Sequence, residues 1–544
     1  MFIEPVSGNR FFGREEVIGT LRKRVTALKG GYRQNLALSG PMLAGKSSIL
    51  RHFLKTIEDR DVISLYTEMG GEGFGVFCAR FMATLLYQYM ASMGEKASGE
   101  LDEMKKACRS RIPQTVRCMD EVKKLLGRRK NDAAYEKLLD LTSVFRSETG
   151  KCCVVILDEF HNLSNFRLKN PFGVFGKYIM VQKNTMYIVS SSQRTLLREI
   201  LSKRLSLLFG NFEVIDVNGF DSQTARSFIS DRVKDIDPDG SIRNYLIQVS
   251  QGSPFYLEAL STRFSQLVKE KHGKGDIKEC LLDAFAELLY ASDGVLNQYF
   301  ENTVNFFLEK KARTKFLPVL LSLARGNSTI KSIQKDLDTT GGEIGAKLQA
   351  LQEMDLVFSS GVFYKITEKL FEYWLKHVYS LRTRAIADDM DIKYLEFKNS
   401  MAKDYELYRV FDAKDVGDVM CDLFRSFNNE KIQVRMNSRK MPKFDAVKSS
   451  ALSENVFQIT GSIQNKKWAC RLKRGDIAEE QDICALWDYK GTGDKSKIVR
   501  KIFVPLNGIE QNAFLLAKEQ NIWVWDVQLL NKILRLFGKF ELTL

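Results

Sequence analysis

The chain has 544 residues, more than one domain usually holds, so we expect several domains. Hydrophobic residues make up 44% of it, yet no apolar run is long enough to span a bilayer and the N-terminus lacks a signal-peptide pattern. The formal net charge of +15 favours polyanionic partners such as nucleic acid, and a basic solvated surface would explain it equally well. The nine cysteines form no CxxC pair and the four histidines are widely spaced, which predicts a reduced cytoplasmic protein without a metal signature.

Residues 35–54, NLALSGPMLAGKSSILRHFL, read as a strand, a glycine-bounded loop and a helix. The loop matches GxxxxGK[ST] at every fixed position, and this strand–loop–helix context is typical of a phosphate-binding loop. Loop amides and the positive helix end attract phosphates, a lysine here reaches the β- and γ-phosphates, and the following hydroxyl holds Mg²⁺. We therefore predict that ATP is bound by Gly40, Gly45, Lys46, Ser47 and Ser48.

Two further apolar strands end in polar residues. The strand in KCCVVILDEFHNL, residues 151–163, ends in Asp158 and Glu159. We expect Asp158 to hold Mg²⁺, directly or through water, and Glu159 to polarise the attacking water. The strand in TMYIVSSSQRTLLREIL, residues 185–201, is apolar through Val189 and ends in polar residues that include Ser192 and Gln193, which could sense the γ-phosphate by orienting the water beside it or could lie in a solvent-facing loop. With another strand at 61–69, these segments predict an α/β core whose nucleotide lies at the carboxyl ends of the strands.

Short segments on either side of these motifs resemble a known family. FFGREEVIGTLRKRV precedes the loop, ILDEFHNL carries the acids, and GSPFYLEALS follows at 252–261. In this order they resemble the archaeal-type ATPases, within the STAND branch of AAA+-related P-loop NTPases, over residues 8–380. The resemblance implies ATP and Mg²⁺ as cofactors, Arg14 beside the base and ribose, and Pro254 over the adenine.

The chain departs from the family pattern at one position. Family members often carry an arginine after the third strand, where this sequence has Asn211. Arg194, Arg198 or Arg204 could take its place, and the sequence does not choose between them. Such an arginine accelerates phosphoryl transfer by orders of magnitude, so its loss predicts slow turnover, which suits a switch better than a motor.

The middle of the chain reads as helices followed by a hairpin. The resemblance implies a lid and then a winged helix, whose candidate recognition helix is GGEIGAKLQALQEM. That helix offers Lys347 but also Glu343 and Glu353, whereas a DNA-reading helix presents several basic and amide side chains. We therefore favour protein or intramolecular docking over DNA reading for this part.

The C-terminal part alternates helices and strands and resembles the restriction-endonuclease-like fold. Active members use a helical Glu, a strand Asp and an acid-x-Lys motif to hold Mg²⁺. Asp445 and Lys473 match the Asp and the Lys, but Arg471 replaces the acid and Cys421 stands at the helical Glu. A single carboxylate is a poor Mg²⁺ site, so we expect a degenerate nuclease. Its strands are basic around Trp468, which predicts salt-sensitive DNA binding, with protein docking as the alternative.

These expectations define a multidomain protein. Its predicted parts are the P-loop ATPase core at 1–220, the helical lid at 221–305, the winged helix at 306–380, a connecting helix at 381–400 and the nuclease-like domain at 401–544. The predicted function is a slowly hydrolysing ATPase that acts as a switch or small machine on DNA. The alternatives are a signalling scaffold that changes oligomeric state with a protein partner, and a Mg²⁺-dependent nuclease. No membrane partner is expected.

Overall fold

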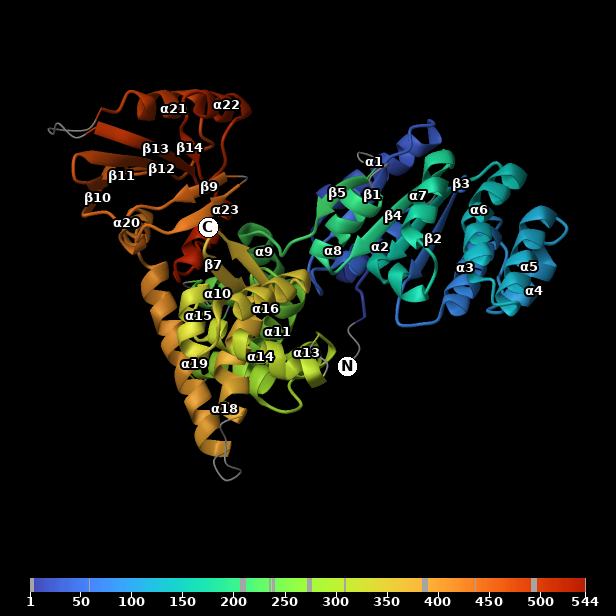
Figure 1. The fold of residues 1–544 in the computed structure, drawn as a ribbon, viewed down its shortest axis with the longest axis horizontal. Coiled ribbons are helices and arrows are strands. Elements are labelled where there is room, and N and C mark those ends of the chain that lie inside the picture. Colours follow the sequence, from blue (N-terminus) through green and yellow to red (C-terminus); the bar gives the residue numbers. More distant parts are fainter. Residues whose placement is uncertain are drawn as a thin grey trace. The chain divides into compact units, whose positions relative to one another are not determined.

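The computed structural model describes residues 4–57, 59–205, 212–233, 236, 240–271, 276–307, 310–383, 390–435, 437–490 and 497–543. The chain divides into two compact units, Met1–Gly219 with Ser253–Phe255, and Phe220–Gly252 with Tyr256–Leu544. Each unit has its own sheet and hydrophobic core (Figure 1). None of the described helices is long and apolar enough to cross a membrane. Asn211 lies outside the described residues.

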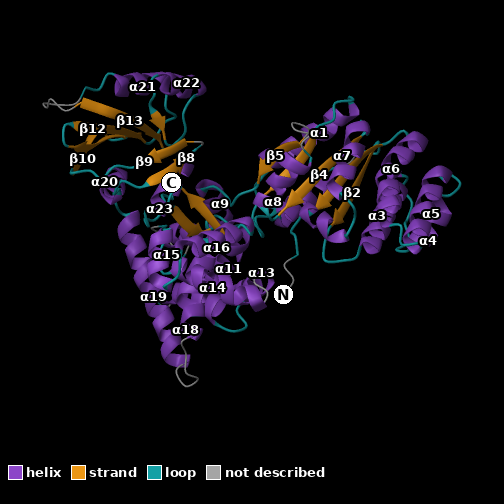
Figure 2. Ribbon diagram, viewed as in Figure 1, coloured by secondary structure: helices purple, strands orange, loops and turns teal. Residues whose placement is uncertain are grey.

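The first unit is built around a parallel sheet in the order β2-β3-β4-β1-β5 (Figure 2). Its strands are β1 (Asn35–Ser39), β2 (Val62–Glu68), β3 (Cys152–Asp158), β4 (Thr185–Ser191) and β5 (Phe212–Asp216). The strands β1, β3 and β4 are buried along their whole length, as expected for a parallel sheet covered on both faces. The predicted α/β core is confirmed.

Two groups of helices cover the two faces of this sheet. In β3, Val154 and Ile156 pack with α1 and α2, while Val155 and Leu157 pack with the helices of the opposite face. This alternation follows from the period of two along a strand. The helices of the unit are α1 (Glu15–Lys29), α2 (Lys46–Lys55), α3 (Phe74–Ser92), α4 (Leu101–Cys108), α5 (Pro113–Gly127), α6 (Asn131–Thr149), α7 (Pro171–Val181) and α8 (Arg194–Glu199).

The second unit begins with helices and one hairpin. The helices up to the hairpin are α9 (Ser222–Val233), α10 (Ser241–Ser250), α11 (Pro254–Glu270), α12 (Ile277–Phe285), α13 (Val295–Phe307), α14 (Lys310–Ala324), α15 (Ile330–Leu337) and α16 (Gly341–Glu353). The hairpin pairs β6 (Val357–Ser360) with β7 (Phe363–Ile366). It is followed by α17 (Lys369–Trp374), α18 (Ser380–Thr383) and the long α19 (Met390–Asp412), which runs through the predicted boundary at residue 400.

A second sheet follows, in the order β10-β11-β12-β13-β14. Its first three strands are antiparallel, β10 (Ala446–Ser453), β11 (Val456–Ile463) and β12 (Lys466–Lys473), and β13 (Lys497–Pro505) and β14 (Trp523–Val524) continue it in parallel. The helices α20 (Val416–Ser426) and α23 (Val527–Leu536) pack on one face, and α21 (Glu480–Trp487) and α22 (Gln511–Glu519) on the other. A separate hairpin pairs β8 (Lys431–Val434) with β9 (Asn437–Lys440).

Candidate active site

The glycine-bounded loop joins β1 to α2 and needs both of its glycines. A Cβ on Gly40 would lie 2.2 Å from the carbonyl oxygen of Val217, closer than any side chain could fit. Gly45 has φ of 94°, in the left-handed region that glycine adopts without strain. Lys46 is only 4% exposed, and its ammonium donates to the carbonyls of Gly40 at 2.9 Å and Pro41 at 2.8 Å. The lysine therefore folds back over its own loop.

Asp158 lies at the end of β3 and collects hydroxyl groups from three other elements. Its Oδ2 accepts hydrogen bonds from Ser47 Oγ at 2.7 Å and from the hydroxyl of Tyr66 at 2.6 Å, and its Oδ1 accepts one from Ser190 Oγ. The carboxylate is 1% exposed. The two residues predicted to hold Mg²⁺, Ser47 and Asp158, are thus in direct contact.

Glu159 follows Asp158 in a left-handed backbone conformation, with φ of 53°. Its Oε2 accepts hydrogen bonds from the amide of Ser192 at 2.9 Å and from the Ser192 hydroxyl at 2.8 Å. Burial raises the pKa of Glu159, and the nearby Lys46 ammonium opposes that rise. Of the two predicted sensors, Ser192 contacts Glu159, whereas Gln193 accepts a hydrogen bond from Ser191 Oγ at 3.2 Å through its backbone carbonyl.

His161 and Tyr66 belong to the same cluster, and the sequence motifs do not identify them. His161 Nδ1 lies 3.3 Å from Glu159 Oε2 and 2.9 Å from Ser191 Oγ. Burial lowers the pKa of His161 to about 4, so the ring is neutral near pH 7. A signal for Tyr66 exists in hindsight, because it lies near the carboxyl end of β2, the strand that pairs with β3.

Two arginines lie around the loop. Arg14 donates to the carbonyl oxygens of Ala44, at 3.3 Å, and Asn218. Arg194, the first residue of α8, donates to Asn218 Oδ1 at 2.9 Å. Burial is the main cause of the lowered pKa of Lys46, and the charge of Arg194 lowers it further, which places that charge within electrostatic reach of the site.

The other two candidate arginines have partners elsewhere. Arg198 lies 3.6 Å from Asp216, and Arg204 stacks over the ring of Phe172 at 5.3 Å. Among the three arginines that the sequence leaves open, Arg194 shares the partner residue Asn218 with Arg14, which lies against the loop.

The remaining predicted nucleotide contacts lie at the edges of the site. Ser48 Oγ accepts a hydrogen bond from the amide of Val6 at 3.1 Å, which ties the helix start to the N-terminal segment. Pro254 begins α11, and residues 253–255 group with the first unit. Gly252 before it has φ of 69°, and a Cβ there would lie 2.1 Å from the carbonyl oxygen of Phe220, so the turn requires glycine. The role of Pro254 over the adenine stays a prediction.

The structure does not bring Asp445 and Lys473 together. The amide of Asp445 donates to the carbonyl oxygen of Ser462, whereas Lys473 pairs with Val456 at the other end of β11. Val456 and Ser462 are six positions apart, which corresponds to about 20 Å along a strand. The ammonium of Lys473 is paired instead with Asp482 at 2.7 Å.

The position of the expected acid carries a different pair. Arg471 is buried and lies opposite Gln458 in the strand register, and its Nε donates to Gln458 Oε1 at 3.4 Å. Cys421 is buried in α20. Within the described residues, no group of three or more His, Cys, Asp or Glu side chains could hold a metal ion. A P-loop Mg²⁺ site does not need such a group, because phosphates and water supply most of its ligands.

A protein-family model matches most of the first unit. Residues 10–169 match the family model described as the AAA ATPase domain. No curated protein matches the sequence. The match and the geometry of the loop together support a P-loop NTPase domain in the first unit.

Solved structures resemble the chain only weakly. A Walker-type ATPase of Pyrococcus abyssi is 16% identical, with 69% of this chain and 99% of that chain covered and a TM-score of 0.47. The ORC2 protein of Aeropyrum pernix, in ADPNP and ADP complexes, is 11% identical, with coverages of 74% and 97% and a TM-score of 0.43. The ORC1 protein of the same organism, in complex with DNA, is 14% identical, with coverages of 68% and 93% and a TM-score of 0.38. At these scores the likenesses carry no argument on function.

Proposed function

We propose that the first unit binds Mg²⁺ and ATP and hydrolyses the nucleotide slowly, as a switch. The observation that carries this proposal is the 2.7 Å hydrogen bond between Ser47 Oγ and Asp158 Oδ2, beside a loop whose lysine is held in place. A hydroxyl and a carboxylate in contact are the protein ligands that a P-loop offers to Mg²⁺. The residues present therefore fit the cofactor.

The loop residues would hold the nucleotide. The ammonium of Lys46 donates hydrogen bonds to neutral carbonyls of its own loop. A phosphate would be a stronger partner for it, because that hydrogen bond is charge-assisted. Bound Mg²⁺ would neutralise charge on the phosphates. Ser47 and Asp158 would hold the ion, and Arg14 and Pro254 are proposed to contact the base side of the nucleotide. ATP is the nucleotide we propose, on the resemblance stated from the sequence.

Glu159 would orient and activate the attacking water. Its carboxylate is fixed by Ser192, with the neutral His161 beside it, so it cannot rotate freely. A raised pKa brings a carboxylate closer to the working pH, which favours general-base catalysis. Ser192 is therefore proposed to report the state of the site by holding or releasing Glu159.

Slow turnover is part of the proposal. Arg194 is the described arginine whose charge reaches Lys46, and we propose it as the arginine that acts on the phosphates. Its side chain is engaged with Asn218, so it would have to exchange that contact to reach them. A rearrangement before chemistry suits a switch.

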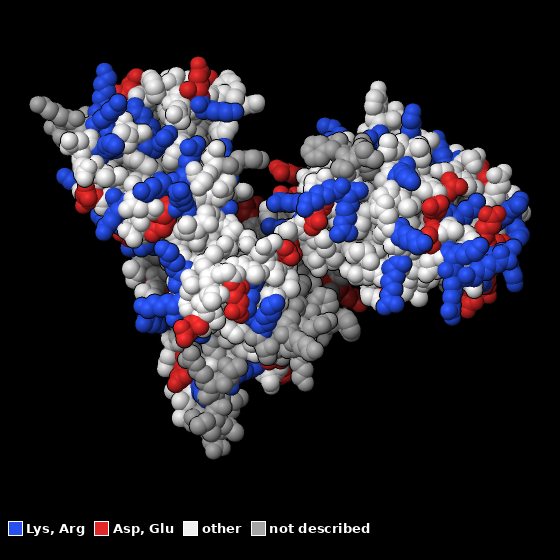
Figure 3. Space-filling model, in the orientation of Figure 1, with Lys and Arg blue, Asp and Glu red and all other residues white. Residues whose placement is uncertain are grey.

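We further propose that the C-terminal sheet binds DNA. Lys and Arg side chains gather over its strands (Figure 3). The guanidinium groups of Arg439 and Arg500 lie 5.0 and 4.2 Å from the ring centre of Trp523, so both cations contact the same indole ring. Like charges gathered at a partly open surface are suited to phosphate contacts, and an aromatic ring can also stack with bases. The domain is proposed to be a nuclease-like fold without the nuclease site.

The hairpin part supports a second partner, a protein. Helices α14 to α16 and the β6–β7 hairpin are proposed to form a winged helix. In α16, Lys347 is only 12% exposed and is neutralised by Glu343 at 2.6 Å. A recognition helix whose lysine is paired offers little to a phosphate backbone, which favours protein docking there.

The Mg²⁺ site is tested by two neighbouring serines. Ser47→Ala should weaken ATP binding about tenfold or more in Mg²⁺ and leave the affinity in EDTA unchanged, because only the Mg²⁺ contact is lost. Ser48→Ala is the matched control, since its hydroxyl bonds Val6, and it should retain the effect of Mg²⁺. Equilibrium titration with a fluorescent ATP analogue measures both. Equal losses in the two variants would refute the assignment of Ser47.

A further inference from the structure

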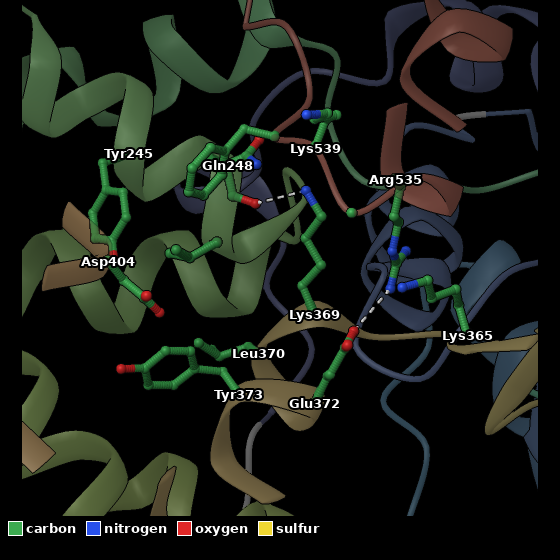
Figure 4. Close-up of a pocket in the computed structure, with 13 residues that line it drawn as sticks. Tyr245, Gln248, Lys365, Lys369, Leu370, Glu372, Tyr373, Asp404, Arg535 and Lys539 are labelled. Atoms are coloured by element: carbon green, nitrogen blue, oxygen red, sulfur yellow. Dashed lines mark hydrogen bonds and ion pairs between the residues drawn. The ribbon is translucent and has the colours of Figure 1, made fainter. Parts of the chain in front are cut away.

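A cavity of about 220 Å³ lies within the second unit, which supplies all of its lining residues (Figure 4). It is formed by α10, the end of β7, α17, α19 and the segment from α23 to residue 540. Its charged lining residues are four basic ones and two acidic ones, namely Lys365, Lys369, Arg535, Lys539, Glu372 and Asp404. Basic groups thus outnumber acidic groups two to one in the lining of a small, partly open cavity.

Two of the basic side chains meet. The side chains of Lys365 and Arg535 end beside each other in Figure 4, whereas the ammonium of Lys369 extends from α17 toward the carbonyl oxygen of Gln248, to which it donates at 3.4 Å. Arg535 Nη2 lies 3.9 Å from Glu372 and donates to the carbonyl oxygen of Thr367 at 3.0 Å. Lys369 pairs with Glu541 at 2.9 Å. These contacts hold two of the cations in position.

Lys365 differs from its neighbours. No residue that the structure describes accepts a hydrogen bond or forms a close ion pair with its ammonium. Burial lowers the pKa of Lys365, and the charge of Arg535 lowers it further against the opposing effect of Glu372. Burial also lowers the pKa of Lys369. The charge of Glu541 raises this pKa, and the charge of Arg535 lowers it. The chain alone gains no stability from gathering these charges, since apolar residues would cost less there.

The uncharged part of the lining is mostly apolar and includes three aromatic rings. Tyr245, Tyr373 and Phe540 contribute rings to the cavity. A site with two adjacent cations and an apolar wall suits an anionic group attached to a small organic body. Its volume is below the roughly 300–1,000 Å³ of pockets for drug-sized ligands, which limits the ligand to about the size of a sugar phosphate.

We propose that this cavity binds a small phosphorylated molecule, with Lys365 and Arg535 at the phosphate and Lys369 and Lys539 elsewhere in the lining. The ligand would supply the acceptor that Lys365 lacks and would separate the charges of Lys365 and Arg535. Because the lining comes from helices, hairpin and C-terminal segment, the bound molecule would fasten these parts of the second unit to one another. This site is independent of the proposed nucleotide site.

The test uses the full chain with Lys46→Ala, so that phosphate compounds do not bind at the P-loop. Ribose 5-phosphate, pyrophosphate and inorganic phosphate are titrated by calorimetry, with potassium chloride at matched ionic strength as the salt control. We expect binding of at least one phosphate compound and a rise in Tm that the chloride does not cause. Lys365→Gln should weaken that binding about tenfold or more, because a charge-assisted contact is lost.

Three further measurements decide between this site and its competitors. Lys539→Gln, at the rim, should also weaken binding, whereas Lys331→Gln on an exposed face of α15 should not. Without ligand, Lys365→Gln should keep or raise the Tm, because the repulsion between Lys365 and Arg535 is removed. Binding that is unaffected by both pocket variants, or absent for all three compounds, would overturn the proposal. The proposal would also be overturned if Lys365→Gln weakened the binding of a DNA duplex but not that of any of the three compounds, because the site would then bind a nucleic-acid backbone.

Discussion

Ser192 holds the carboxylate of Glu159 through two hydrogen bonds, from its amide at 2.9 Å and from its hydroxyl at 2.8 Å. The two residues come from different strands, since Glu159 follows β3 and Ser192 follows β4. The pairing of those strands therefore sets the orientation of the proposed catalytic carboxylate.

Removal of the Ser192 hydroxyl should slow hydrolysis without weakening nucleotide binding. Ser192→Ala keeps the amide contact but frees one side of the carboxylate, so we expect kcat to fall about tenfold with little change in the Kd for ATP. Gln193→Ala is the control, because Gln193 accepts a hydrogen bond from Ser191 Oγ through its backbone carbonyl, which the substitution keeps. Steady-state turnover and equilibrium binding separate the two effects. Equal losses of kcat in both variants would show that Ser192 is not the residue that positions Glu159.

The buried carboxylate of Glu159 should also lower stability at alkaline pH. Burial raises its pKa, so the folded state binds the proton more tightly than the unfolded state does. The fold is therefore favoured below the pKa of an unfolded Glu, and that advantage is lost as the pH rises through the folded pKa. Glu159→Gln, without nucleotide, should raise the Tm at pH 8 and show a smaller gain at pH 5. The exposed Glu454→Gln is the control, and the same pH dependence in both variants would disprove the assignment.

The cations around Trp523 should carry part of the DNA affinity. Arg500→Gln removes one of the two guanidinium groups over that ring, so we expect roughly tenfold weaker binding and a salt slope reduced by about one. Arg128→Gln, on an exposed loop of the first unit, is the matched control. Fluorescence anisotropy with a duplex over a range of salt concentrations measures both quantities. An unchanged slope for Arg500→Gln, or no salt-dependent binding by the wild type, would rule out this surface.

The nucleotide loop could be predicted because its signal is local. A strand, two glycines at fixed spacing and a helix determine the geometry around Lys46 and Ser47 within a few residues. The contact from Ser47 to Asp158 depends on distant residues, but parallel strands end at the same edge, so strand-end acids fall near the loop. The carboxyl end of β2 gives a signal for Tyr66 only once β2 is known to pair with β3, and the place of His161 depends on the backbone turn at Glu159.

The C-terminal part shows where pattern reasoning fails. The strand pattern around Asp445 gives no information on which end of a neighbouring strand it meets, and the register of β10 with β11 places it far from Lys473. The connecting helix is longer than predicted for a related reason. Phe397, Met401, Tyr405 and Tyr408 are buried at helical spacing, so the apolar face of α19 continues past residue 400. The charged residues between these four make the helical spacing of the buried residues hard to recognise in the sequence.

The central claim is that the first unit hydrolyses ATP at the site formed by the loop, Asp158 and Glu159. It is tested most directly by ATP turnover of the wild type and of Glu159→Gln, each with and without double-stranded DNA. We predict slow, Mg²⁺-dependent turnover by the wild type, stimulated by DNA, and a loss of about 10²- to 10⁴-fold in the variant with ATP still bound. Turnover that is equal in the two proteins would contradict the claim.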